Sequence, residues 1–107
     1  MYQRLMAYLS LAFYSISNRF IVAGRDEEAR YFVSLYKLAD GANTEAWYLS
    51  ALLNARNDNA QAAQDDLMKA VSFGFTDRTR MNQQPEFQKL ASQINFPAIE
   101  RKMQGGK

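Results

Sequence analysis

Apolar residues near the start of the chain recur at the spacing of an α-helix. They stand at i, i+4, i+7, i+8, i+11 and i+15, and they are Leu5, Leu9, Ala12, Phe13, Ile16 and Phe20. This spacing places them on one face of a helix, which we expect to face the core. Gly24 breaks the pattern, so the helix is expected to end there.

A second helix is predicted from the acidic residues that follow. Residues 26–28 are all acidic, and the helix dipole favours negative charge at an N-terminus. This helix is expected to bury Ala29, Val33 and Tyr36. It stops at Gly41, because glycine readily adopts the left-handed conformation that is common at helix ends.

Two further helices follow the same plan. Asn43 or Thr44 is the N-cap of a helix that runs to about Arg56. After a polar turn at residues 57–59, a partner helix ends at Gly74. Its apolar residues are Ala60, Ala63, Leu67, Ala70 and Val71. No segment alternates between polar and apolar residues for long enough to make a strand, so the expected fold class is all-α.

The two helix pairs are related by a nearly constant offset along the chain. The matched residues are Phe13 and Trp47, Ala29 and Ala63, and Asn43 and Asp77. Their separation of about 34 residues is a period typical of proteins built from stacked helical repeats. This repeat offset therefore predicts two helical hairpins that pack side by side.

The repeated residues resemble the tetratricopeptide repeat (TPR) family over roughly residues 10–77. Both units have a bulky aromatic, a small alanine at the helix crossing and a later hydrophobe. These residues are Phe13, Ala29 and Val33 in the first unit, and Trp47, Ala63 and Leu67 in the second. The second alanine position of the family holds Tyr36 and then Ala70. Its leucine–glycine pair is replaced by Ile16-Ser17 and Ser50-Ala51. The resemblance implies antiparallel hairpins stacked as a short right-handed superhelix.

The end of the chain is expected to be a helical cap. A third unit is expected near Arg78, but Pro85 breaks its first helix and instead starts a short one. Phe87, Leu90 and Ile94 then cover the last exposed helix face, and a final short helix runs from Pro97 to about Met103. The chain is thus expected to be one domain, 1–103, with units at about 10–43 and 44–77, a cap at 78–103 and a flexible tail at 104–107.

The composition argues against catalysis. The chain has no histidine and no cysteine, which removes the usual acid–base, thiol and metal-binding side chains. The carboxylates of Asp65 and Asp66, and those of residues 26–28, point in different directions because adjacent helical residues diverge, and we expect them to be solvated. No glycine-rich phosphate loop is present. We therefore expect no enzyme activity, metal or cofactor.

The TPR resemblance implies a role in binding a protein. In that family the inner surface of the first helices binds an extended peptide or a partner helix. By register this groove would contain Leu11, Tyr14, Asn18 and Ile21 from the first unit and Glu45, Tyr48, Leu52 and Arg56 from the second. Alternatively, these residues pack against missing N-terminal repeats or against a second copy of the chain.

A second apolar set on the first helix favours such self-association or missing repeats. It contains Tyr8, Leu11, Tyr14, Ile21 and Val22. Large exposed apolar patches mark an interface of some kind. We weigh two further classes: a regulatory or oligomerisation domain of a larger protein, and a weak nucleic-acid-binding module.

Nucleic-acid binding is the less favoured of these, and a membrane span is not expected. The candidate cations for nucleic-acid binding are Arg19, Arg25, Arg30, Lys37 and Arg56. The net charge is only +2 and the basic residues are dispersed, so charge alone indicates no partner. No apolar run is long enough to cross a membrane.

Overall fold

The computed structural model describes residues 2–105, with the side chains of residues 7–104. Over this range the protein is all-helical, as predicted, with seven helices and no strand. The helices are α1 (Tyr2–Val22), α2 (Asp26–Ala39), α3 (Thr44–Arg56), α4 (Ala60–Ser72), α5 (Arg78–Gln83), α6 (Pro85–Lys89) and α7 (Phe96–Gly105). The predicted flexible tail is partly wrong, because Gln104 and Gly105 belong to α7; residues 106–107 lie outside the described residues.

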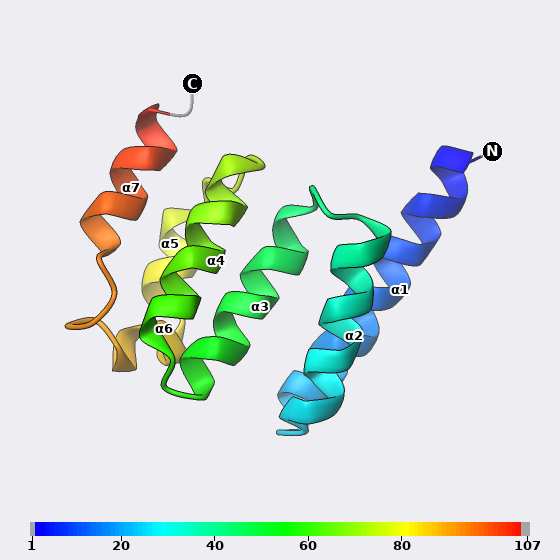
Figure 1. Cartoon of the computed structure of the whole chain (residues 1–107), viewed down its shortest axis with the longest axis horizontal. Coiled ribbons are helices and arrows are strands. Elements are labelled where there is room, and N and C mark those ends of the chain that lie inside the picture. Colours follow the sequence, from blue (N-terminus) through cyan, green and yellow to red (C-terminus); the bar gives the residue numbers. More distant parts are fainter. Residues whose placement is uncertain (1, 106–107) are drawn as a thin grey trace.

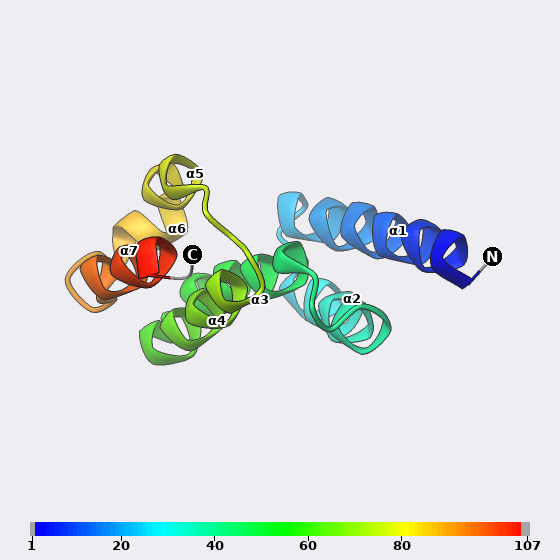
Figure 2. The same cartoon turned by 90° about the horizontal axis from the view of Figure 1, so that it is seen from above.

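The helices form a row across the molecule (Figure 1). The antiparallel pair α1–α2 lies at one end, α3 and α4 form a second antiparallel pair in the middle, and α5–α7 lie at the other end. Figure 2 shows α1 and α5 on the same side of the row, with α3 between them and set back. The first helix of the second pair, α3, therefore lies between the first helix of the chain and the C-terminal helices.

Local sequence explains most of the helix boundaries. The Asn43 side chain accepts a hydrogen bond from the Glu45 amide at 2.9 Å, so Asn43 is the N-cap of α3. Gly24 has a φ of 76° just after α1, a backbone conformation that glycine adopts without strain. Asn59 and Asp77 cap α4 and α5 in the same way as Asn43.

Gly41 differs from its predicted role. The helix α2 ends at Ala39, and Gly41 does not have a left-handed φ. Its lack of a side chain serves close packing instead, because an added Cβ would lie 3.1 Å from the Lys37 carbonyl oxygen. The Gly41 carbonyl also accepts a hydrogen bond from the Trp47 indole at 2.7 Å.

Positions related by the repeat offset have matching burial in the two pairs. Ala29 and Ala63 are both fully buried, and so are Ser17 and Ala51. The other matched core positions are Val33 with Leu67 and Tyr36 with Ala70, while Phe13 and Trp47 are both partly buried against the core. The small side chains of Ser17, Ala29, Ala51 and Ala63 let the helix backbones approach closely.

The core face of α1 is turned relative to the prediction. Leu9 and Ala12 are exposed, whereas Ser17 and Ile21 are buried. The side chain of Leu5 lies outside the described residues. The helix packs against α3 as well as α2, so its buried face is rotated toward α3. The assignment of Ile21 to an outer apolar face was therefore wrong.

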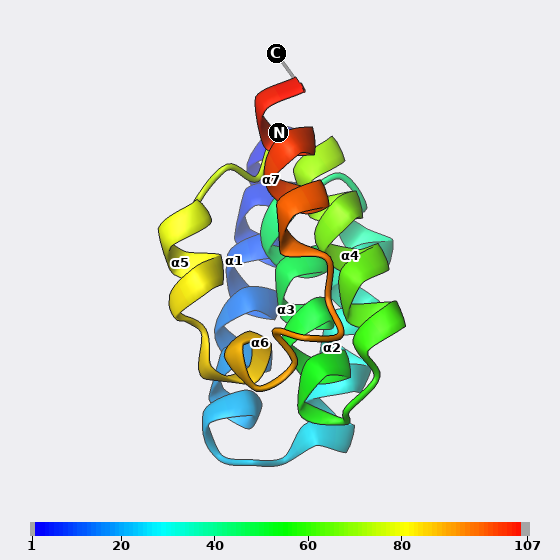
Figure 3. The ribbon, with the colours of Figure 1, turned by 90° about the vertical axis from the view of Figure 1, so that its left-hand side faces the viewer.

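The C-terminal part forms the predicted cap. Pro85 is in the first turn of α6, after an extended Gln84 that separates α6 from α5. Phe87, Leu90 and Ile94 are all buried. The last helix, α7, packs on α4 and lies in front of it in Figure 3. The outer side of α4 is thus covered by α7.

Candidate interaction surface

The predicted groove is partly filled by the protein itself. Ile21, Tyr48 and Leu52 are buried, so the prediction that they line an open surface is wrong. Ile21 is covered because α1 packs on α3, whereas Tyr48 of α3 lies under the cap, since α6 packs on α3 and α5 on α6. The Tyr48 ring contacts Phe75 and, edge-on, Phe87, with centroid distances of 5.1 and 5.6 Å.

Polar contacts fasten the cap over Tyr48. Its hydroxyl donates a hydrogen bond to the Gln84 side chain at 3.0 Å. The Arg80 guanidinium lies over its ring and also pairs with Glu45 at 2.7 Å. Burial raises the pKa of Tyr48 to about 12, although the positive charge of Arg80 opposes this. Tyr48 is therefore a neutral structural residue and not a ligand contact.

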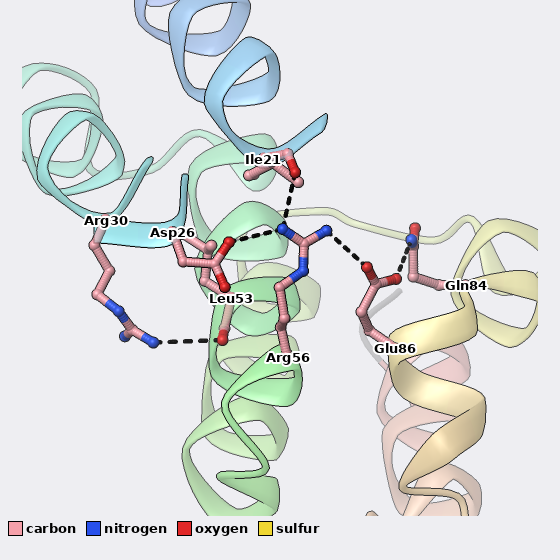
Figure 4. A network of polar contacts seen from close by, with 7 residues as sticks. All are labelled: Ile21, Asp26, Arg30, Leu53, Arg56, Gln84 and Glu86. Carbon is pink, nitrogen blue, oxygen red and sulfur yellow. Dashed lines mark hydrogen bonds and ion pairs between the residues drawn. The ribbon is translucent and has the colours of Figure 1, made fainter. Parts of the chain in front are cut away.

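Arg56 is the centre of a polar network at the other end of α3 (Figure 4). Its guanidinium donates to the Ile21 carbonyl and to the Asp26 carboxylate, both at 2.8 Å, and to Glu86 at 2.9 Å. Burial raises the pKa of Glu86, but hydrogen bonds from Gln84 and Arg56 outweigh it, and the net pKa is lowered. Arg56 thus joins α1, α2 and α6 to α3, and its predicted place in a binding groove stays a prediction.

The open part of the predicted surface lies near the start of α3. Leu11 is 67% exposed, Asn18 is exposed, and Tyr14 and Glu45 are half-buried. Here a pocket of about 400 Å³ is lined by Ala7, Ser10, Leu11, Tyr14, Tyr36, Asn43 and Glu45. Three predicted residues, Leu11, Tyr14 and Glu45, therefore share one pocket, which we call the α1–α3 pocket.

The other residues that line the α1–α3 pocket were not predicted from the sequence as part of a binding site. Tyr36 was expected only as a core residue, and burial together with the charges of Glu45 and Asp40 raises its pKa to about 12. Ser10 and Asn43 both donate hydrogen bonds to the Asp40 carboxylate, at 2.7 and 2.9 Å. The pocket thus combines aromatic and aliphatic walls with one acidic residue, Glu45, and with two polar side chains that hydrogen-bond to Asp40.

A second pocket, of about 440 Å³, lies between α2 and α3 and is mostly polar. Its lining residues are Glu27, Arg30, Tyr31, Val33, Ser34, Lys37, Ser50, Leu53 and Asn54. Lys37 donates to the Ser50 hydroxyl at 2.8 Å, and Ser50 and Asn54 each donate to Asp66 at 2.7 Å. Asp66 is therefore a structural acceptor, and the expectation that it is simply solvated was wrong.

Contacts within the fold engage most of the cations that were considered for nucleic-acid binding. Arg25 pairs with Glu28, and Arg30 donates to the Asn54 side chain and the Leu53 carbonyl. Lys37 also lies 4.2 Å from the centroid of the Trp47 ring, and burial lowers its pKa despite the nearby Asp66.

Two other classes of site find no support in the described residues. No group of three or more acidic side chains there could hold a metal ion. None of the helices in residues 2–105 is both long enough and apolar enough to cross a membrane. The α1–α3 pocket therefore remains the strongest candidate for binding.

Comparisons with known proteins give no family. No protein-family model matches the chain, and no curated protein or solved structure shows significant similarity to it. The resemblance to TPR proteins therefore stays a prediction, and the residues themselves must carry any functional interpretation.

Proposed function

We propose that the protein is a non-catalytic interaction scaffold that binds a peptide, a partner helix or another copy of itself. Its two hairpins would stack as a short TPR-like right-handed superhelix. The matching burial of Ser17 with Ala51, and of Ala29 with Ala63, supports this arrangement. In such a stack the first helices of the hairpins, α1 and α3, form the inner surface.

The α1–α3 pocket is the observation that carries this proposal. Leu11 is 67% exposed at a pocket whose other walls include two tyrosines. Concave sites with apolar walls and a few polar groups are the usual form of a binding site. The carboxylate of Glu45 in the pocket wall favours a ligand with an apolar side chain next to a cationic group or free N–H donors.

A peptide library displayed on phage and selected on the immobilised protein tests the proposal. We expect enriched peptides to combine an apolar residue with lysine or arginine. Their affinity should fall at least about tenfold for Leu11→Asp, which is about 1.4 kcal/mol. Leu38→Asp, at another highly exposed leucine on α2, should bind as the wild type does. Binders that tolerate Leu11→Asp would place recognition elsewhere.

A regulatory or oligomerisation domain of a larger protein is the second candidate. It is favoured by large exposed apolar residues outside the pocket, including Tyr31 and Leu38 on α2. A nucleic-acid-binding role is less favoured, because most of the cations that were considered for it are engaged within the fold. Fluorescence anisotropy with single-stranded RNA in low salt should show no saturable binding.

A further inference from the structure

The two hairpins carry different chemistry at equivalent positions. In the second hairpin, Ser50, Asn54 and Asp66 form a hydrogen-bonded polar cluster on the side that meets α2. Lys37 and Arg30 of α2 donate to Ser50 and Asn54. The second hairpin therefore contacts the first through side chains that accept hydrogen bonds from two cations, Lys37 and Arg30.

The first hairpin replaces this cluster with apolar residues. The equivalent positions one repeat earlier are Ile16, Phe20 and Phe32, and Leu35 stands at the position of Lys69. The Phe20 and Phe32 rings stack with centroids 5.6 Å apart and an interplanar angle of 17°. Ile16, Phe20, Phe32 and Leu35 are all half-buried, and we call this surface the end face.

The end face has no partner within the described chain. It belongs to α1 and α2, the pair at one end of the row, and Figures 1 and 2 show no helix beyond them. By the repeat register it is the side on which a preceding hairpin would dock. These half-buried aromatic and aliphatic side chains leave part of their apolar surface in water.

Another hairpin of the same kind does not fit the end face. It would present cations at the positions of Arg30 and Lys37, and the end face offers Ile16, Phe20 and Phe32 in place of their acceptors. Burying an unpaired cation is strongly unfavourable. The opposite end of the row is closed by α7 on α4, so head-to-tail stacking of copies is also disfavoured.

We propose that the end face binds the end face of a second copy in a twofold dimer. A twofold contact requires a surface that is complementary to itself. The edge of the end face meets this requirement, because Arg25 lies 5.6 Å from the Phe20 ring centroid and pairs with Glu28. Their side chains are 61% and 38% exposed, so each copy offers both charges. This inference rests on the proposed interaction role and names its partner.

Light scattering after size-exclusion chromatography tests the dimer. The wild type should have twice the 12.3 kDa mass of the chain. The triple variant Ile16→Ser, Phe20→Asn, Phe32→Asp gives the first hairpin the polar residues of the second, so it should be a monomer with unchanged helical circular dichroism. Leu11→Asp, outside the end face, should remain a dimer.

Cysteine cross-linking provides a measurement that does not depend on the triple variant. The chain has no cysteine, so a single one can be placed at will. Under mild oxidation Ile16→Cys should form a disulfide-linked dimer, because a twofold contact between end faces brings both copies of residue 16 into one interface. Lys102→Cys, on α7, should not.

Three results would overturn the dimer: a monomeric wild type at high concentration, a triple variant that stays dimeric, or loss of the dimer in Leu11→Asp. The last would transfer self-association to the α1–α3 pocket. Equal cross-linking of Ile16→Cys and Lys102→Cys would also overturn the end-face dimer. Peptide binding by the monomeric triple variant would show that the proposed scaffold function stands even where the dimer does not form.

Discussion

The guanidinium of Arg80 lies 4.0 Å from the centroid of the Tyr48 ring. The same group pairs with Glu45, so one side chain of α5 holds both an aromatic and an acidic residue of α3. This contact closes a surface that would otherwise be open. Together with the buried Met81 and the Tyr48–Gln84 hydrogen bond, it holds the short helix α5 in place.

Arg80→Ala should loosen α5 selectively. The variant loses a cation–π contact and a charged hydrogen bond, which together contribute about 1–2 kcal/mol. Hydrogen exchange measured by mass spectrometry should become faster in residues 78–83, with little change in α2. Arg78→Ala is the control, because the Arg78–Glu100 pair is longer, at 3.6 Å, and more exposed. Equal effects of the two substitutions would contradict this role of Arg80.

Arg56→Ala should destabilise the whole protein. It removes three hydrogen bonds that join α1, the start of α2 and α6 to α3. We expect a loss of about 2 kcal/mol in the free energy of unfolding, because the carboxylates of Asp26 and Glu86 lose a charged donor. Denaturant titration measures it, and Arg56→Lys should recover only part, since an ammonium lacks the planar fork.

The matched control for Arg56 is Lys89→Ala. Lys89 pairs with Asp58 at 2.9 Å, but both side chains are at least half exposed. Exposed ion pairs contribute little to stability. If Lys89→Ala lowered the free energy of unfolding as much as Arg56→Ala does, the network around Arg56 would contribute no more to stability than an exposed ion pair.

Ser17→Ala should stabilise the protein. The Ser17 hydroxyl is fully buried and has no hydrogen-bond partner in the described part of the chain, whereas the equivalent residue of the second hairpin is Ala51. Removing an unsatisfied hydroxyl should add about 1 kcal/mol to the free energy of unfolding. Ser50→Ala should do the opposite, because it takes a donor from Asp66 and an acceptor from Lys37. Thermal and denaturant unfolding of both variants give the comparison, and a loss of stability in Ser17→Ala would show that its hydroxyl is bonded.

Two tyrosines should make the fold sensitive to alkaline pH. The pKa values of Tyr36 and Tyr48 are both raised from 10.0 to about 12, in each case mainly by burial. Between pH 10 and 12 the unfolded chain has lost protons that the folded chain keeps, so stability is full below pH 10 and falls as the pH rises through this window. Denaturant midpoints against pH should show this slope, and Tyr36→Phe and Tyr48→Phe should each reduce it. An unchanged slope in both variants would exclude these groups as its source.

The sequence predicted the helices well because their signals are local. An N-cap at Asn43 or Thr44, a stop at Gly24 and a helix start at Pro85 all depend on one turn of backbone. The structure has the N-cap at Asn43 and confirms the other two. The buried alanines followed from the repeat offset, which relates residues on a regular scaffold.

The candidate site was predicted less well because it depends on contacts between distant parts of the chain. Whether Tyr48 faces solvent is decided by Arg80 and Phe87, which belong to the cap and lie far from it in the sequence. The hydrogen bonds of Asp66 with Ser50 and Asn54 likewise join different helices. Spacing along one helix gives no indication of such partners.

The break at Pro85 sets the direction in which this architecture can grow. Because the chain turns at Gln84 and returns as α7 against α4, the edge on which an additional hairpin would build is already occupied. An extra hairpin could instead be inserted between the existing two, where Lys37 and Asp66 both hydrogen-bond with Ser50 and form a polar joint that can be copied. Pro85 thus separates two short helices, α5 and α6, at the place where a third long helix pair would otherwise begin.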